Sequence, residues 1–138
     1  MGLSAGQGEP GKVPRTLRIL VADDDGDTVL TLMMVLRSEG HQVKGVHRGT
    51  EVLAGIREFE PDAVLADINM PGLTGYEIAR KVRADKYSRK PLLIGISGVY
   101  TQGSDRVLAE LVGFDHYLTK PYAPSDLLRL LAPLRLPR

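Results

Sequence analysis

Polar side chains that could hold a metal ion and a phosphoryl group stand directly after four short apolar runs. The polar positions are the acidic run Asp23–Asp25, Asp67, Ser97 and Lys120, and the runs before them are Leu17–Ala22, Ala63–Ala66, Leu92–Ile96 and the patch around Tyr117–Leu118. Such unbroken apolar runs are typical of strands in a parallel sheet covered by helices on both faces. Because ligands bind at the carboxyl ends of such strands, the spacing predicts a crevice lined by carboxylates, a hydroxyl and an ammonium group.

Several carboxylates in one crevice need a counter-charge. Two carboxylates about 4 Å apart repel by roughly 4 kcal/mol at an effective dielectric of about 20, so Asp23, Asp24 and Asp67 together predict a bound cation. Mg²⁺, with Mn²⁺ as the alternative ion, prefers oxygen ligands and is typically held by carboxylates and a phosphate. A carboxylate beside that ion can attack phosphorus and become an aspartyl phosphate. Lys120 and Ser97 would then stabilise the developing charge.

Length and composition exclude several classes of protein. The chain has 138 residues, which suits one domain with a single core, and its formal net charge of +1 indicates neither nucleic acid nor a membrane as a direct partner. It contains no cysteine, which excludes disulfides and thiol catalysis. No stretch resembles a signal peptide or approaches the roughly 20 apolar residues of a membrane span. We therefore expect a soluble cytoplasmic protein.

Strand-like and helical segments alternate along the chain, as in repeated βαβ units. Residues 1–15 hold glycine and proline without periodicity and are predicted to form a flexible tail, whereas residues 16–138 are predicted to form the folded domain. A run at Gln42–Val46 brings the predicted strands to five, the last one lying around residues 116–118. The pattern predicts an α/β fold with five strands and five helices.

Capping residues and apolar spacing predict where these helices begin. Asp27 and Ser104 are expected to cap the first and fourth helices, Thr50 to open the second and Thr74 to cap the third, with Pro124 in the first turn of the fifth. Thr74 and Glu77 match a capping box, in which each side chain accepts a hydrogen bond from the other residue's backbone.

The apolar character of the first helix predicts that it is well buried, with Met33 and Met34 in the core. The three histidines, His41, His47 and His116, show no metal-ligand spacing and are expected at the surface or at a sheet edge.

Four local motifs stand in order along nearly the whole chain. Residues 16–25 read Thr-Leu-Arg-Ile-Leu-Val-Ala-Asp-Asp-Asp, and residues 61–77 read Pro-Asp-Ala-Val-Leu-Ala-Asp-Ile-Asn-Met-Pro-Gly-Leu-Thr-Gly-Tyr-Glu. Ser97 follows the fourth predicted strand, and residues 117–121 read Tyr-Leu-Thr-Lys-Pro. From about residue 15 to residue 134, this order resembles the receiver domain of bacterial two-component response regulators.

The resemblance implies a doubly wound (βα)5 fold of the CheY-like, flavodoxin-like type, with a five-stranded parallel sheet in the order 2-1-3-4-5. It also implies the ligands of the metal ion. These are Asp23, Asp24, Asp67 and the backbone carbonyl of Asn69, with Asp24 binding more directly than Asp23.

The resemblance further makes Asp67 the phosphoacceptor and pairs Lys120 with the phosphoryl group. Ser97 and Tyr117 would form the conformational switch, and the peptide before Pro121 would be cis. Two departures from the family pattern affect positions next to the site: Gly98 replaces the usual alanine, and Ala123 offers no capping side chain to the last helix.

The implied function is that of a phosphoacceptor signalling domain. A sensor histidine kinase or a phosphotransfer protein would donate the phosphoryl group, and the surface of the fourth helix, fifth strand and fifth helix would carry the signal onward. Such a domain catalyses only its own phosphotransfer and dephosphorylation, so it is not a turnover enzyme. The downstream protein target is not specified by the sequence, and a homodimer through the last helices stays open.

Two alternatives stand beside this interpretation. The segment Asp23–Gly26 after a strand also resembles the first motif of haloacid-dehalogenase-like phosphatases, with Asp23 as nucleophile, although Asp27 stands where threonine is expected. The other alternative is a receiver-like interaction module that works without phosphate. A glycine-rich stretch at residues 6–12 lacks the Ser or Thr of a phosphate-binding loop, and residues 23–34 lack the glycine and glutamate of a calcium loop.

Overall fold

The computed structural model describes residues 14–68, 70, 74–86, 90–97 and 113–136. Within them, five parallel strands form one sheet in the order β2-β1-β3-β4-β5. The strands are β1 (Arg18–Ala22), β2 (Gln42–Val46), β3 (Ala63–Asp67), β4 (Leu92–Ser97) and β5 (His116–Thr119). The predicted fold class and strand order are confirmed.

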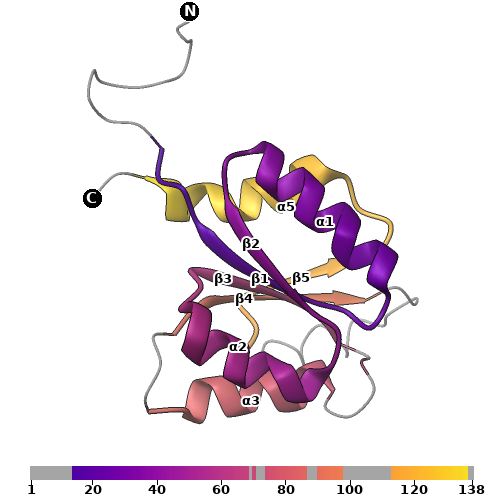
Figure 1. Cartoon of the computed structure of the whole chain (residues 1–138), viewed down its shortest axis with the longest axis vertical. Helices are drawn as coiled ribbons and strands as arrows, with labels where there is room; N and C mark the ends of the chain where they lie inside the picture. Colours follow the sequence, from indigo (N-terminus) through magenta and orange to yellow (C-terminus); the bar gives the residue numbers. More distant parts are fainter. Residues whose placement is uncertain (1–13, 69, 71–73, 87–89, 98–112, 137–138) are drawn as a thin grey trace, which may run out of the picture.

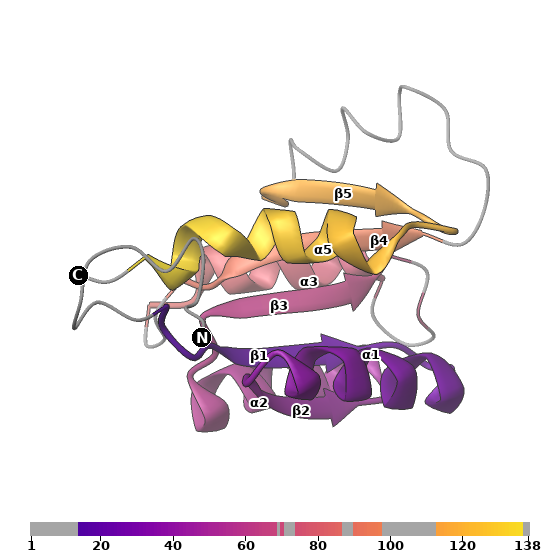
Figure 2. The ribbon, with the colours of Figure 1, turned by 90° about the horizontal axis from the view of Figure 1, so that it is seen from above.

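Helices cover both faces of the sheet (Figure 1). One face carries α1 (Gly26–Ser38) and α5 (Pro124–Leu131), and the other carries α2 (Val52–Phe59) and α3 (Gly75–Ala84). The turned view in Figure 2 shows the strands running side by side with their arrowheads toward the same edge. The predicted fourth helix, expected to begin at Ser104, lies outside the described residues.

Two apolar cores explain why the strands contain unbroken apolar runs. Alternate residues of β1 belong to different cores: Ile19 packs with α1 and α5, whereas Leu20 packs with α2 and α3. Successive side chains of a strand point to opposite faces, and here both faces are covered. The central strands β1, β3 and β4 therefore show no alternation between apolar and polar residues, whereas β2 at the edge of the sheet does, with Gln42 exposed and Val43 buried.

The capping box of α3 is confirmed. The Thr74 hydroxyl oxygen accepts the Glu77 N–H at 3.2 Å, and the Glu77 carboxylate accepts the Thr74 N–H at 3.0 Å. Hydrogen bonds from the backbone and from the side chain of Thr74 to the Glu77 carboxylate lower the pKa of that carboxyl. The last helix also begins as predicted, with Pro124 in its first turn and Ala123 as an N-cap that makes no side-chain hydrogen bond.

The predicted beginnings of α1 and α2 are wrong by one or two residues. The N-cap of α1 is Asp25 rather than Asp27, because the Asp25 carboxylate accepts the Asp27 N–H at 3.3 Å and the Thr28 hydroxyl at 2.7 Å. Thr50 does not open α2; it lies within a 3₁₀ turn, η1 (Gly49–Glu51), that precedes the helix.

The first helix is less buried than predicted. Met34 is 71% exposed and Leu30 61% exposed, whereas Met33 packs against the core on the α1 side. Leu30 and Met34 lie four residues apart, which places them on one outer stripe of the helix. His41 is not at the surface, because it is only 4% exposed, but it does lie next to a sheet edge, since it directly precedes the edge strand β2.

The two ends of the described chain lie together. The backbone N–H of Arg15 donates to the carbonyl of Arg135 in the 3₁₀ turn η2 (Ala132–Arg135) at 2.8 Å. Residues 1–13 lie outside the description, so the flexible tail stays a prediction. In the part of the chain that the structure covers, no helix is long and apolar enough to cross a membrane.

Candidate metal centre

The register between β1 and β3 brings two of the predicted site residues together. Ala22 of β1 is paired with Ala66 of β3. Asp23 and Asp67 directly follow these paired residues, so their backbones are neighbours at the carboxyl edge of the sheet. The first carboxylate of the acidic run and the predicted phosphoacceptor are thus juxtaposed by strand pairing alone.

The register on the other side of β3 adds the hydroxyl and the ammonium group. Asp67 is paired with Ile96 of β4, the residue before Ser97, and Ser97 is paired with Thr119 of β5, the residue before Lys120. The Lys120 N–H donates to the Ser97 carbonyl at 2.7 Å and extends the ladder by one residue. Because β1, β3, β4 and β5 are consecutive in the sheet, their chemistry-bearing ends form one row.

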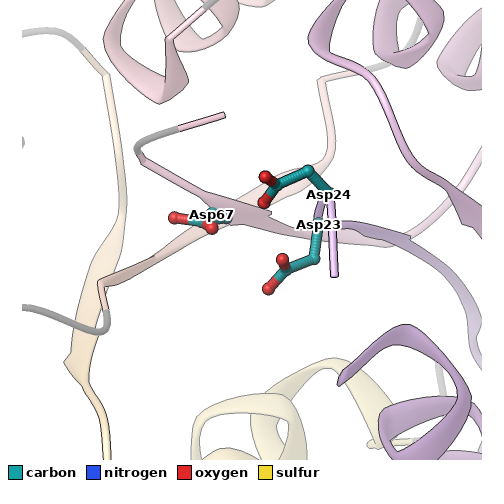
Figure 3. Close-up of side chains that lie close together, drawn as sticks. All are labelled: Asp23, Asp24 and Asp67. Atoms are coloured by element: carbon teal, nitrogen blue, oxygen red, sulfur yellow. The ribbon is translucent and has the colours of Figure 1, made fainter. Parts of the chain in front are cut away.

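Three carboxylates gather at this edge and form the acidic cluster. Asp23, Asp24 and Asp67 each offer an oxygen within 4.8 Å of the others, and Figure 3 shows the three side chains converging. Asp23 is 4% exposed, Asp67 is half-buried and Asp24 is exposed. Ligand oxygens about 2.1 Å from Mg²⁺ lie roughly 3 to 4 Å apart, so this donor set fits a small hard cation after slight convergence.

The buried carboxylate of Asp23 is held on both oxygens. Its Oδ1 accepts the Asp25 N–H at 2.9 Å, and its Oδ2 lies 3.3 Å from the Lys120 ammonium nitrogen. Burial, and to a smaller extent the charge of Asp23, raises the pKa of the Tyr122 hydroxyl. Asp23 is therefore fixed in place, while the exposed Asp24 and half-buried Asp67 stand at the open side of the cluster.

The remaining predicted site residues differ in how far the structure describes them. Ser97 is 1% exposed at the end of β4. The half-buried ring of Tyr117 packs against the core on the α2 and α3 side, and its hydroxyl oxygen is buried. The peptide between Lys120 and Pro121 is cis, as the resemblance implied. Asn69 and Gly98 lie outside the described residues.

One residue next to the site, Gly75, received no role from the sequence. Its N–H donates to the carbonyl of Ile68 at 2.7 Å, and the Ile68 N–H donates to the carbonyl of Ile96 at 2.9 Å. A Cβ atom at Gly75 would lie 2.5 Å from the Cα of Ile68, which is too close. Gly75 thus allows α3 to begin against the residue that follows Asp67. A glycine in the first turn of a predicted helix, where alanine is favoured, was the available signal.

We expect Gly75→Ala to destabilise the protein by about 1–3 kcal/mol, because the clash is with backbone that cannot rotate away. Urea unfolding would measure the loss. Gly26→Ala, in the first turn of α1 with nothing within 4 Å of its added Cβ, is the matched control. The control should be neutral or slightly stabilising, and equal unfolding midpoints for the two variants would contradict the close approach.

Comparison with known proteins identifies relatives across almost the whole domain. The family model described as the response regulator receiver domain matches residues 19–132. The DNA-binding response regulator MtrA of Mycolicibacterium paratuberculosis is 40% identical over 119 residues, which are 86% of this chain and 51% of MtrA. The chain thus spans about half the length of the mycobacterial relatives that it matches.

Solved structures agree with these relatives. A receiver domain from Bermanella marisrubri superposes with a TM-score of 0.78 and 31% identity, covering 87% of this chain and 98% of that one. The receiver domain of sensor histidine kinase PA1611 from Pseudomonas aeruginosa, with a magnesium ion in its active site cleft, gives a TM-score of 0.75 and 30% identity over 85% of this chain and 95% of that one. None of these matches favours the phosphatase interpretation. The strand order of this chain, the polar residues at the ends of its strands and its match to the family model fit one family. The chain belongs to the response regulator receiver domain family.

Proposed function

We propose that the chain accepts a phosphoryl group on Asp67 in a reaction that depends on Mg²⁺. The observation that carries this proposal is the acidic cluster of Asp23, Asp24 and Asp67 with the Lys120 ammonium group beside it. Like charges at such distances need a cation, and hard oxygen donors favour Mg²⁺, with Mn²⁺ as the alternative. The magnesium ion in the cleft of the PA1611 receiver domain, a structural relative, supports the same assignment.

Asp67 is the proposed nucleophile because its carboxylate lies at the end of β3, between Asp23 at the end of β1 and Ser97 at the end of β4. One Asp67 oxygen forms the new bond to phosphorus while the donor's bond to phosphorus breaks, and the donor group leaves with that electron pair. Lys120 would neutralise charge on the phosphoryl oxygens, and its present pairing with Asp23 holds it at the correct edge. A bound Mg²⁺ would neutralise the carboxylates and the incoming phosphoryl oxygens.

Roles for the remaining residues belong to the same proposal. Asp24 would bind the metal more directly than Asp23, whose two oxygens are already engaged by Asp25 and Lys120. Asn69 would contribute its backbone carbonyl. Ser97 and Tyr117 would turn toward the phosphorylated site and alter the surface of the predicted fourth helix, β5 and α5.

The proposed phosphoryl transfer to Asp67 requires a protein that donates the phosphoryl group. A sensor histidine kinase or a phosphotransfer protein would supply the phosphoryl group, and a cytoplasmic location and a downstream protein target stay predictions. The name of MtrA includes DNA binding, but the chain matches only 51% of that protein, and we propose no direct nucleic-acid contact for this domain. As a signalling domain it would catalyse only its own phosphotransfer and dephosphorylation.

The test is intact-protein mass spectrometry after incubation with acetyl phosphate, with Mg²⁺ or with a chelator. We expect one phosphate-sized mass gain that requires the metal, because without it the acidic cluster repels an anionic donor. An absence of gain with Mg²⁺ present would favour an interaction module that works without phosphate. An equal gain in the chelator would contradict the metal requirement.

A further inference from the structure

A buried histidine lies at the end of the sheet opposite the acidic cluster. His41 directly precedes β2 and is 4% exposed. Its Nδ1 accepts the backbone N–H of Leu17 at 3.1 Å, whereas its Nε2 is buried and has no hydrogen-bond partner among the residues described. Buried polar atoms are usually paired, and burial disfavours a positive charge on an imidazole, so this environment favours the neutral form of His41.

The imidazole takes the place of a backbone carbonyl at the start of the sheet. Leu17, just before β1, is fully buried, and its carbonyl accepts the Gln42 N–H at 2.9 Å. Its own N–H is satisfied by His41. An imidazole can accept a hydrogen bond only while neutral, because both nitrogens of the charged form are donors. A proton on Nδ1 would therefore remove the acceptor and place two donors face to face.

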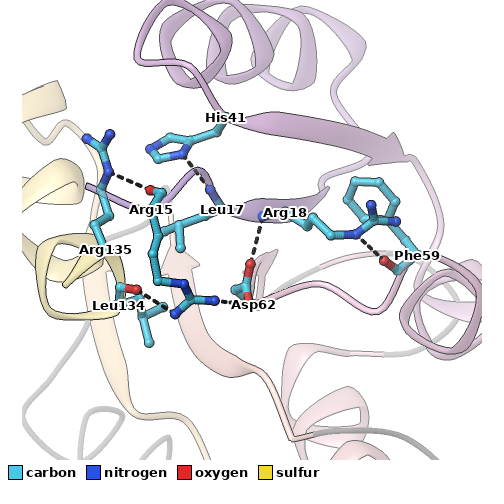
Figure 4. Close-up of polar contacts among 8 residues, drawn as sticks. All are labelled: Arg15, Leu17, Arg18, His41, Phe59, Asp62, Leu134 and Arg135. Atoms are coloured by element: carbon cyan, nitrogen blue, oxygen red, sulfur yellow. Dashed lines mark hydrogen bonds and ion pairs between the residues drawn. The ribbon is translucent and has the colours of Figure 1, made fainter. Parts of the chain in front are cut away.

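Close to His41, the two ends of the described chain are bound to each other (Figure 4). The Arg15 N–H donates to the Arg135 carbonyl at 2.8 Å, and the Arg135 Nε donates to the Arg15 carbonyl at 3.1 Å. The Arg15 guanidinium also donates to the Leu134 carbonyl at 2.9 Å and lies 3.6 Å from an Asp62 oxygen. We call the contacts of Arg15 with Leu134 and Arg135 the terminal joint.

The charges around His41 come from three elements. Burial has the largest effect on His41 and lowers its pKa, and the positive charge of Arg135 in η2 lowers that pKa further. Glu39 after α1 and Asp62 before β3 act in the opposite sense, without reversing the direction. The same guanidinium that helps close the terminal joint therefore opposes a charge on His41.

We propose that His41 makes the terminal joint sensitive to pH, so that the joint holds while the imidazole is neutral and opens when His41 takes up a proton. Opening would let the first rung of the sheet at Leu17 separate and would move Arg135 away from the new positive charge. The turn η2 would then be held less firmly to the start of β1. This proposal does not depend on phosphorylation at the other end of the sheet.

The sign of the effect follows from linkage. Well above a pH of about 6.5, the ordinary pKa of histidine, His41 is neutral in both the closed and the open joint, and the joint has its full stability. Below that pH the exposed histidine of the open form binds a proton that the closed form resists. The equilibrium constant for opening should therefore rise by up to about tenfold per pH unit until the lowered pKa of the closed form is reached.

Hydrogen exchange measured by NMR between pH 7.5 and pH 5 tests this proposal. After correction for intrinsic exchange rates, the protection of the Leu17 and Arg15 amides should fall below pH 6.5 by up to about tenfold per unit. The amide of Leu65 in β3, at the centre of the sheet, should keep its protection. Constant protection at Leu17 and Arg15, or an equal fall at Leu65, would overturn the proposal.

Two variants separate His41 from other titrating groups. His41→Asn keeps an oxygen acceptor near the position of Nδ1 but does not titrate, so the pH dependence of amide protection should disappear. His47→Asn, at an exposed position, is the control and should leave that pH dependence unchanged. A fall that persists in His41→Asn would overturn the proposal. If that variant does not fold, nitrogen chemical shifts of His41 in the unaltered protein decide: titration at or above pH 6.5 would contradict a neutral buried imidazole.

Discussion

Replacing Asp67 with asparagine should abolish phosphate uptake from acetyl phosphate, with a loss on the order of 10³-fold or more. An amide has nearly the same shape as a carboxylate, but it lacks the negatively charged oxygen that attacks phosphorus. Asp67 lies at the edge of the sheet, after the buried strand residues of β3, so the fold should survive the exchange. A time course of intact mass, with circular dichroism as a check on folding, measures the effect.

Asp23→Asn is the matched control for this prediction, because it neutralises another carboxylate of the same cluster. In the receiver mechanism it slows phosphorylation through loss of metal binding, but a higher Mg²⁺ concentration should restore part of the rate. Steady hydrolysis of p-nitrophenyl phosphate that is lost in Asp23→Asn and kept in Asp67→Asn would instead identify Asp23 as the nucleophile. That pattern would contradict the assignment of Asp67.

Replacing Lys120 with methionine should slow phosphorylation by roughly 10- to 100-fold. Removal of one preorganised donor to a developing charge commonly lowers a rate by 10² to 10³, and here a bound metal would carry part of that task. Methionine keeps most of the length and apolar stem of the side chain. The rate of phosphate uptake at saturating Mg²⁺, measured by intact mass, reports the change.

Loss of the ammonium group has a second consequence, since it leaves the 4% exposed Asp23 without its cationic partner. The variant should therefore also be less stable by about 1–3 kcal/mol, and rates must be compared well below its unfolding midpoint. Lys44→Met is the control, because Lys44 lies on β2, away from the cluster, and its ammonium nitrogen is 3.4 Å from a carboxylate oxygen of Glu58 in α2. This replacement should change neither the phosphorylation rate nor the stability much. A rate for Lys120→Met within threefold of the unaltered protein would exclude the proposed role.

The strands and the row of chemistry at their ends could be predicted from the sequence because one physical cause underlies both. A sheet covered on both faces needs unbroken apolar runs, and the first polar residue after each run marks the sheet edge. The apolar run Ala63–Ala66 agrees with β3 to within one residue. The strand predicted at Gln42–Val46, which is not an unbroken apolar run, has the bounds of β2. The apolar runs alone did not predict the order of the strands in the sheet. Asp23, Asp67 and Ser97 are neighbours only because β1, β3 and β4 are adjacent in that sheet.

The errors have a different physical origin. Apolar residues occur around most of α1, so composition could not decide which stripe faces outward, and Met34 is 71% exposed. His41 is buried because its imidazole satisfies the Leu17 N–H across 24 positions of sequence, a contact that no local pattern reveals. The N-cap of α1 is displaced because Asp25 and Asp27 are both good caps, and only the backbone path selects Asp25.

The most direct test of the central claim is to locate the phosphoryl group. The protein would be incubated with acetyl phosphate and Mg²⁺, reduced with borohydride to convert an aspartyl phosphate into homoserine, digested and sequenced by tandem mass spectrometry. We expect conversion at Asp67 alone, in the peptide that carries β3. Conversion at Asp23 or Asp24 with Asp67 intact, or a phosphate that survives borohydride on another residue, would contradict it.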